Sequence, residues 1–158
     1  MKKNLIKDTG VEVTELSFGT SSLGSMPDTY GYEVPEQRAQ ETLKRFFQGP
    51  VNVLDTSRNY AMGESEKRIG KAIKENGGWP ENFVLSTKID RNMDTLVLDK
   101  KRTRESIEES LKTLNVDSVD ILFLHDPEYV KDINDITKKD GAMDELFKIK
   151  EEGLAKAV

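Results

Sequence analysis

The rest of the chain is arranged around the segment VNVLDTSRNYAMGESE, residues 51–66. It opens with a short β-branched run that ends in Asp55, and Tyr60 follows five residues later, before a glycine-containing segment that leads into a helix. Two other apolar runs end in the same way, one in Lys88 and one in His125. Hydrophobic strands that each end in a titratable side chain indicate an arrangement built for more than packing.

Around this stretch, strand-like runs alternate with amphipathic helical patterns. In each helical segment the apolar residues fall on one face. Alternation of this kind predicts a parallel sheet with crossover helices, here preceded by a small hairpin. We expect the hairpin at 3–14, strands at 15–20, 51–55, 83–88, 118–125 and 154–158, and helices at 36–47, 64–76, 101–114 and 142–152.

Composition narrows the class of protein. The chain has 158 residues, enough for one domain spanning residues 1–158. Its net charge of −5 argues against a nucleic-acid surface, which would need a basic patch. The absence of cysteine excludes disulfides and thiolate metal sites. The sequence contains neither a signal-peptide core nor an apolar run of the ~20 residues that span a bilayer, so we expect a cytoplasmic protein without a membrane partner.

The strand ends suggest a shared site. The carboxyl ends of parallel strands meet on one face, where barrel enzymes keep their active sites, so Asp55, Lys88 and His125 should lie side by side. Taken singly, Asp55 would be a capping residue, Lys88 a solvated strand end, His125 a structural histidine and Tyr60 a packed loop aromatic. Together they form a set that can move a proton on and off an oxygen.

The chemistry of that set follows from its members. Tyr60 can donate a proton, and a lysine ammonium beside a phenol favours the phenolate. Asp55 supplies the partner that a buried Lys88 needs, and His125 can donate a hydrogen bond to a substrate oxygen. The sequence indicates no nucleophile–base pair of the hydrolase kind and no metal-ligand cluster around its one histidine. The set suits a redox reaction in which a cofactor handles the hydride.

The order and spacing of several motifs resemble the aldo-keto reductases. The matching segments are Gly19-Thr20, Asp55-Thr56-Ser57, Asn59-Tyr60, Gly63-Glu64-Ser65-Glu66, Ile69-Gly70, Ser86-Thr87-Lys88, Ser110-Leu111 and VDILFLH at 119–125. The resemblance implies a (β/α)8 barrel of the TIM type with a bottom hairpin, and a catalytic tetrad of Asp55, Tyr60, Lys88 and His125. The segments HDPE at 125–128 and GLAKAV at 153–158 are most similar to the aldose and fucose 1-dehydrogenase branch. Ala61 departs from the glycine that many relatives carry after the tyrosine.

The same resemblance implies the cofactor and the substrate. The cofactor would be NAD or NADP, contacted by Gly19, Thr20, Ser21 and Asp55. The substrate would be a small carbonyl compound or sugar: an aldehyde, a ketone or an aldose hemiacetal. No metal site is implied.

Chain length sets the main departure from the family. A barrel of this type needs ~250 residues, so these 158 residues correspond to the N-terminal half: the hairpin, about four βα units and the start of strand five. An alternative function is therefore a catalytically silent half-barrel that acts as a binding or assembly module. We expect bare sheet edges, and an inner face at Leu54, Leu85 and Leu122 or their neighbours that lacks its opposite half. Such a surface favours self-association or union with the missing C-terminal half.

Overall fold

The computed structural model describes all residues from 1 to 158. Its centre is a five-stranded parallel sheet in which each strand pairs with the next one along the chain. This sequential order is the one expected for the first part of a (β/α) barrel. The strands are β3 (Ser17–Gly19), β4 (Val53–Asp55), β5 (Val84–Ile89), β6 (Val119–Leu124) and β7 (Ala155–Ala157).

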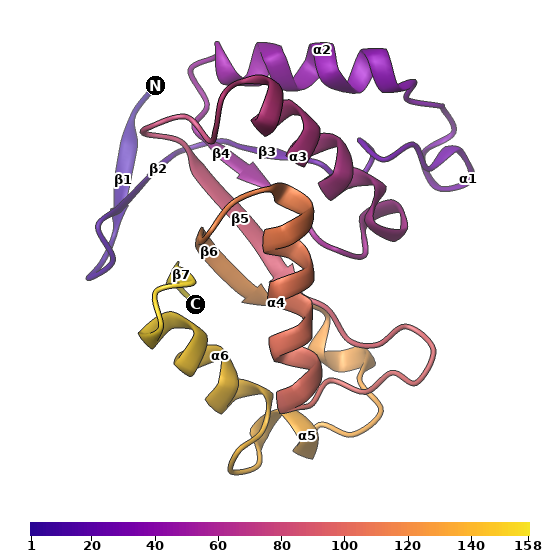
Figure 1. Cartoon of the computed structure of the whole chain (residues 1–158), viewed down its shortest axis with the longest axis vertical. Helices are drawn as coiled ribbons and strands as arrows, with labels where there is room; N and C mark the ends of the chain where they lie inside the picture. The colour runs from indigo at the N-terminus through magenta and orange to yellow at the C-terminus, as the bar shows by residue number, and fades with distance from the viewer.

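Four long helices connect these strands. In Figure 1, α3 and α4 run in front of the sheet, α2 lies above them and α6 lies beside β7. Their bounds are α2 (Glu36–Phe47), α3 (Glu64–Glu75), α4 (Lys100–Leu114) and α6 (Ala142–Glu151). The connections also contain the short helices α1 (Pro27–Tyr30), η1 (Tyr60–Gly63), η2 (Pro127–Tyr129) and α5 (Asn134–Thr137).

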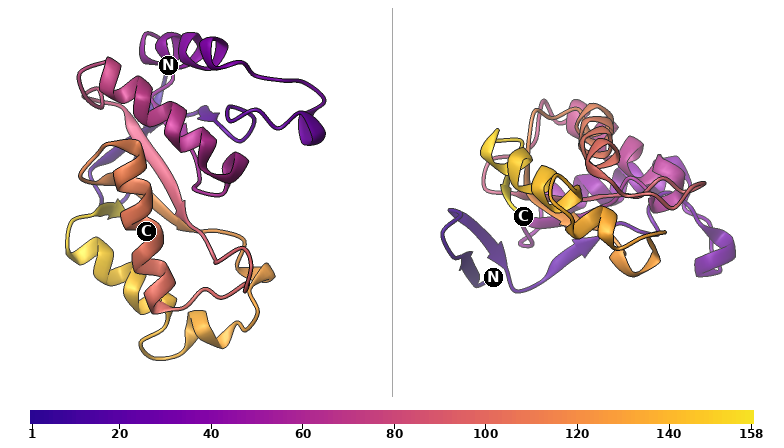
Figure 2. Two further views of the ribbon diagram at one scale, coloured as in Figure 1. Left: turned by 45° about the vertical axis from the view of Figure 1, so that its right-hand side comes forward. Right: turned by 90° about the horizontal axis from the view of Figure 1, so that it is seen from below.

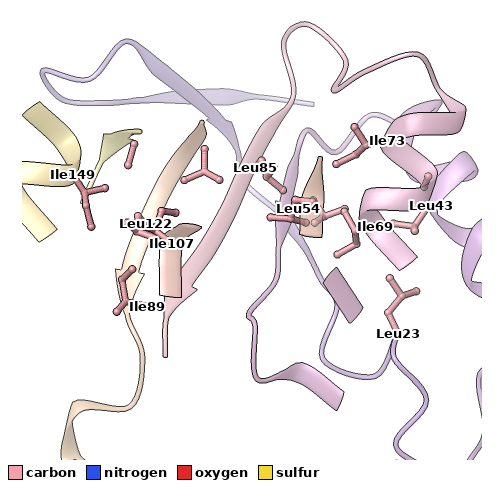
Figure 3. Packing of buried hydrophobic residues seen from close by; sticks show 14 of the residues in the cluster. Leu23, Leu43, Leu54, Ile69, Ile73, Leu85, Ile89, Ile107, Leu122 and Ile149 are labelled. Carbon is pink, nitrogen blue, oxygen red and sulfur yellow. The ribbon is translucent and has the colours of Figure 1, made fainter. Parts of the chain in front are cut away.

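The main core lies between the sheet and the helices. Leu54, Leu85 and Leu122 are at most 1% exposed, and they pack with buried helix residues such as Ile69 and Ile107 (Figure 3). Of the two alternatives expected for the inner face, these three leucines or their neighbours, the first is therefore wrong and the second holds. Side chains alternate along a strand, and the leucines occupy the parity that faces the helices.

A second, smaller cluster forms on the opposite face of the sheet. It comprises the neighbours of those leucines together with a residue of the hairpin: Val11, Val53, Val84, Ile121 and Ala157. The antiparallel hairpin of β1 (Lys3–Ile6) and β2 (Val11–Thr14) packs against this face (Figure 2). The hairpin thus already buries the part of the inner face against which it packs.

Asn52 fastens the hairpin to the sheet. Its Oδ1 accepts a hydrogen bond from the Thr14 amide at 2.9 Å, and its Nδ2 donates to the Glu12 carbonyl at 2.8 Å and to the Asn82 carbonyl at 3.0 Å. Asn52 is 4% exposed, so each of these bonds is shielded from water. The single amide side chain therefore joins the hairpin, the segment before β4 and the segment before β5.

The expected elements agree with the observed ones apart from their ends. The predicted strand at 83–88 continues to Ile89, so Lys88 lies inside β5 and not at its end. The predicted loop after the first parallel strand contains the short helix α1. The larger surprise follows β4, where η1 replaces a plain loop.

Candidate active site

The sheet brings the sequence-predicted residues to one edge. Asp55 is the last residue of β4, Lys88 is the penultimate residue of β5, and His125 directly follows β6. The register pairs Asp55 with Ser86 and Lys88 with Phe123, so all three side chains emerge at the carboxyl ends of adjacent strands.

Asp55 and Lys88 form a hydrogen-bonded ion pair. Lys88 Nζ lies 2.7 Å from Asp55 Oδ2 and also donates to the Thr56 carbonyl at 2.8 Å. Ser86 Oγ donates to Asp55 Oδ1 at 2.9 Å. The Lys88 side chain is 13% exposed and the Asp55 side chain 29% exposed, so the pair is half open to water. The carboxylate and carbonyl fix the direction in which the ammonium points.

Tyr60 lies next to both Lys88 and His125. Lys88 Nζ is 4.6 Å from the centroid of the Tyr60 ring, which allows a cation–π contact. The Tyr60 and His125 rings meet edge to face with centroids 5.7 Å apart. All four sequence-predicted residues of the tetrad therefore share one site.

The backbone after Tyr60 is strained. Ala61 and Met62 have φ of 51° and 52°, in the left-handed region that L-residues avoid, and Gly63 follows with φ of 91°. The departure noted at Ala61 therefore falls on a residue whose conformation favours glycine. Strain of this kind persists only where the surrounding contacts enforce it.

Sequence reasoning missed a second carboxylate at the site. Asp90 is 1% exposed, and its Oδ1 lies 2.5 Å from His125 Nδ1. Its Oδ2 accepts hydrogen bonds from Ser57 Oγ at 2.7 Å and from the Asn59 amide at 3.1 Å. A signal was present in the sequence, because residues i and i+2 of a strand share a face, so Asp90 follows Lys88 on the same side.

Ser57 brings together the residue types of a hydrolase triad but not its geometry. Its Oγ lies 3.2 Å from His125 Nδ1, yet its proton is donated to Asp90 and the residue is fully buried. In a hydrolase triad, the serine and the carboxylate bind opposite nitrogens of the imidazole. Here both face Nδ1, so Ser57 supports the ring and does not serve as a nucleophile.

Glu66 is another buried carboxylate near the sheet. It accepts a hydrogen bond from Thr87 Oγ1 at 2.8 Å, on the helix-facing side of β5, and forms no ion pair. Burial raises the pKa of Glu66 to about 7, against the lowering effect of that hydrogen bond. The group therefore titrates near neutral pH.

The residues expected to contact a cofactor lie at the end of β3. Gly19 pairs in register with Asp55, and a side chain added there would meet no atom within 4 Å, so the space above it is open. Thr20 is buried, and its hydroxyl donates to the Asp55 carbonyl at 2.9 Å. Ser21 Oγ accepts a hydrogen bond from the Tyr30 hydroxyl at 2.7 Å. The space beside Gly19 is therefore open, while Thr20 holds the end of β3 to Asp55.

No group of three or more His, Cys, Asp or Glu side chains is placed to hold a metal ion. None of the helices combines the length and the apolar character that crossing a membrane would need.

Known proteins share both the sequence pattern and the fold. The model of the Aldo/keto reductase family matches residues 15–158. An L-galactose dehydrogenase of Arabidopsis thaliana is 37% identical over 122 residues, which are 77% of this chain and 37% of that protein. A probable voltage-gated potassium channel subunit beta of the same plant is 34% identical over 129 residues, 80% of this chain and 37% of that protein.

Solved structures give the same result. The aldo-keto reductase AKR11C1 from Bacillus halodurans, in its holo form, superposes with a TM-score of 0.76 at 27% identity, covering 99% of this chain and 48% of that one. This chain thus has the fold of part of a (β/α)8 barrel, and it spans half or less of the length of these relatives. From the family match and the shared fold, the chain belongs to the aldo/keto reductase family.

Proposed function

We propose that this chain supplies the proton-transfer half of an NAD(P)-dependent oxidoreductase. The reaction interconverts an aldehyde, ketone or aldose hemiacetal and its reduced or oxidised partner. The observation that carries the proposal is the Lys88 ammonium, held 2.7 Å from Asp55 and 4.6 Å from the Tyr60 ring. A phenol beside a fixed ammonium is suited to exchange a proton with a substrate oxygen.

Each side chain has a defined part in carbonyl reduction. NAD(P)H, when bound, supplies a hydride to the carbonyl carbon. Tyr60 gives its hydroxyl proton to the carbonyl oxygen, and the Lys88 ammonium stabilises the phenolate that remains. Asp55 holds Lys88 in place, and His125 orients the oxygen. Oxidation of an alcohol or hemiacetal is the same sequence reversed, with the Tyr60 phenolate accepting the proton.

The cofactor contacts in this half are few. We assign them to Gly19, Thr20, Ser21 and Asp55, the end of β3 and its neighbour. The open space beside Gly19 supports a contact there, whereas Thr20 is buried with its hydroxyl, amide and carbonyl all engaged, so its part is to hold the end of β3 against Asp55. Nothing at this end of β3 discriminates NAD from NADP.

The choice of substrate rests on a relative. One similar protein is an L-galactose dehydrogenase, which supports a sugar hemiacetal as the substrate class. Because the chain spans 37% of that protein, this assignment concerns a whole enzyme of which these residues are the matching part. The cytoplasm remains our proposed location, from composition alone.

The second candidate is an assembly module without turnover. A similar protein carries the name of a potassium channel subunit beta, which supports a binding role for some members of the family. In this chain β3 and β7 are the two edges of the parallel sheet, and unpaired edges attract another strand. We expect the chain to pair with a second copy or with a C-terminal half-barrel. A stable monomer of 17.9 kDa in light scattering would contradict that expectation.

Replacement of Tyr60 tests the enzymatic proposal. Tyr60→Phe keeps the ring and removes the hydroxyl group whose proton is transferred to the carbonyl oxygen. Carbonyl reduction should therefore fall by about 10²–10⁴-fold while nucleotide binding survives. Steady-state kinetics and a fluorescence titration with NAD(P)H measure the two effects. Tyr32→Phe, in an exposed loop, is the matched control and should leave turnover unchanged. Equal turnover in the Tyr60→Phe variant would disprove the assignment.

A further inference from the structure

The left-handed turn that follows Tyr60 is enclosed from two sides. Its backbone has φ of 51° at Ala61 and 91° at Gly63. On one side Ala61 packs so closely against Gly24 that a Cβ added to Gly24 would overlap the Ala61 methyl. On the other side the Arg58 guanidinium lies directly on Gly63, because a Cβ added there would overlap Arg58 Nη1. The turn is thus held between the loop after β3 and a charged side chain.

Packing and charge together hold the Arg58 side chain. Its Nε is shielded from water and makes no hydrogen bond. The same atom lies 3.8 Å from Glu109 Oε2, and the Arg58 side chain is 30% exposed. Glu109 belongs to α4, the helix that packs beside α3 (Figure 1). The guanidinium therefore touches the turn and faces a carboxylate of the neighbouring helix.

The Glu109 carboxylate is itself fixed by Arg102, about two turns earlier on α4. Arg102 Nη1 and Nη2 donate to its two oxygens at 3.1 and 2.9 Å, a bidentate contact that defines the orientation of the carboxylate. The hydrogen bonds from Arg102 lower the pKa of Glu109, so this group stays ionised. Arg102 Nε also donates to the backbone carbonyl of Asp90 at 3.0 Å. One carboxylate thus faces both the arginine on the turn and the arginine that holds the end of β5.

We propose that Arg58 is a positioning residue that enforces the left-handed turn and thereby sets the place of Tyr60 in the site. Tyr60 lies directly before the turn, so a relaxed turn would carry its ring away from Lys88 and His125. The ring now lies 4.6 Å from Lys88 Nζ and 5.7 Å from the His125 ring, and a displacement of about 1 Å is enough to impair catalysis. This inference rests on the proposed function for its effect on turnover, but the placement of the ring can be measured without turnover.

Nuclear Overhauser contacts between the Tyr60 and His125 rings test the placement in the 158-residue chain. His125 is the only histidine, so its ring protons are identified without ambiguity. Arg58→Met keeps most of the stem and removes the guanidinium, and we expect these contacts to weaken severalfold or to disappear. Arg38→Met, at an exposed arginine of α2, is the matched control and should leave them unchanged. Contacts that are absent from the wild type, or equally strong in Arg58→Met, would overturn the proposal.

Three further variants separate the charge from general stability. Arg58→Lys keeps a cation opposite Glu109 and should restore part of the ring contacts. Glu109→Gln removes the anion of α4 and should weaken them, which decides the question if Arg58→Met does not fold. Glu108→Gln, at the exposed neighbouring carboxylate, is its matched control. Thermal melts should differ little, because exposed ion pairs contribute little to stability. Ring contacts that follow the melting temperature and not the charge would contradict a positioning role.

Kinetics in the NAD(P)-loaded enzyme test the consequence for catalysis. Arg58→Met should lower kcat by about 10- to 100-fold while KM for NAD(P)H stays the same, because a ring that moves by about 1 Å loses its alignment. In a Tyr60→Phe background the same substitution should have no further effect, since it acts through that ring. Equal losses in the two backgrounds would rule out action through Tyr60. If Tyr60→Phe left turnover intact while the ring contacts still depended on Arg58, the proposed function would fail and the positioning role would stand.

Discussion

Two carboxylates end neighbouring strands of the sheet, and each holds a nitrogen of the site in a different way. Asp55 is 29% exposed, and its partner Lys88 keeps a second bond to a backbone carbonyl. Asp90 is 1% exposed and accepts from Ser57 as well as from His125. Water can stand in for a partner of the first carboxylate but not of the second. The comparison shows that a carboxylate paired with a nitrogen at a strand end can exchange its partner for water where the carboxylate is exposed, and is held in one geometry where the carboxylate is buried.

The loop between β4 and α3 joins the two pairs. The Thr56 carbonyl accepts from Lys88, while Ser57 and the Asn59 amide bind Asp90. The loop then presents Tyr60 between them. A change in either pair should therefore shift the position of Tyr60, the residue that we assign to proton transfer.

Truncation of each carboxylate tests the comparison at its strongest. Asp90→Ala should lower the free energy of unfolding by about 3–5 kcal/mol, because it leaves buried donors without a partner. Asp55→Ala should cost roughly 1 kcal/mol or less, because water can reach Lys88. Urea unfolding followed by circular dichroism measures both. Equal losses, or a larger loss for Asp55→Ala, would show that depth does not separate the pairs.

Glu66 extends the comparison to a buried carboxylate that forms no ion pair. Its pKa rises on folding from 4.5 to about 7, so between these values the folded chain holds a proton that the unfolded chain releases. The free energy of unfolding should then fall as pH rises through this window, by about 1.4 kcal/mol per unit at most and about 3 kcal/mol in all. Above the window the loss is complete.

Glu66→Gln removes that proton exchange. The difference in unfolding free energy between variant and wild type should grow in favour of glutamine from about pH 4.5 to 7 and then stay constant. Urea titrations at a series of pH values give the difference, from which other titrating groups cancel. Parallel curves for the two proteins would mean that Glu66 keeps an ordinary pKa.

The smallest effect concerns the backbone of the loop that joins the pairs. Ala61→Gly should raise the free energy of unfolding by up to about 1 kcal/mol, because glycine adopts a φ of 51° without the penalty of a Cβ. Ala72→Gly, inside α3, is the matched control and should lower stability by about 1 kcal/mol or more. Thermal melts compare the two signs. A loss in both variants would mean that contacts of the Ala61 methyl outweigh the strain.

The fold and part of the site could be predicted because both follow periodic rules. Alternating strand and helix patterns give the parallel sheet, and the strand-end rule gives the meeting of Asp55, Lys88 and His125. Asp90 could be placed on the same side as Lys88 but not against His125, since that contact depends on β5 continuing past Lys88 and on a loop folding back to it. The left-handed turn at Ala61 had one signal only, the glycine that many relatives carry at this position, because alanine itself favours a helix. Long-range contacts and enforced strain lie outside what local pattern encodes.

The asparagine-fastened hairpin has a consequence for synthesis on the ribosome. The hairpin precedes the five strands of the parallel sheet along the chain, and each later strand adds beside the previous one. The lower inner cluster can therefore grow from Val11 as Val53, Val84 and Ile121 emerge in turn. Each addition closes a loop no longer than the segment between two successive strands, which favours stepwise folding. Because the hairpin is already present when these strands emerge, it can bury their inner-face apolar side chains before the later strands are synthesised.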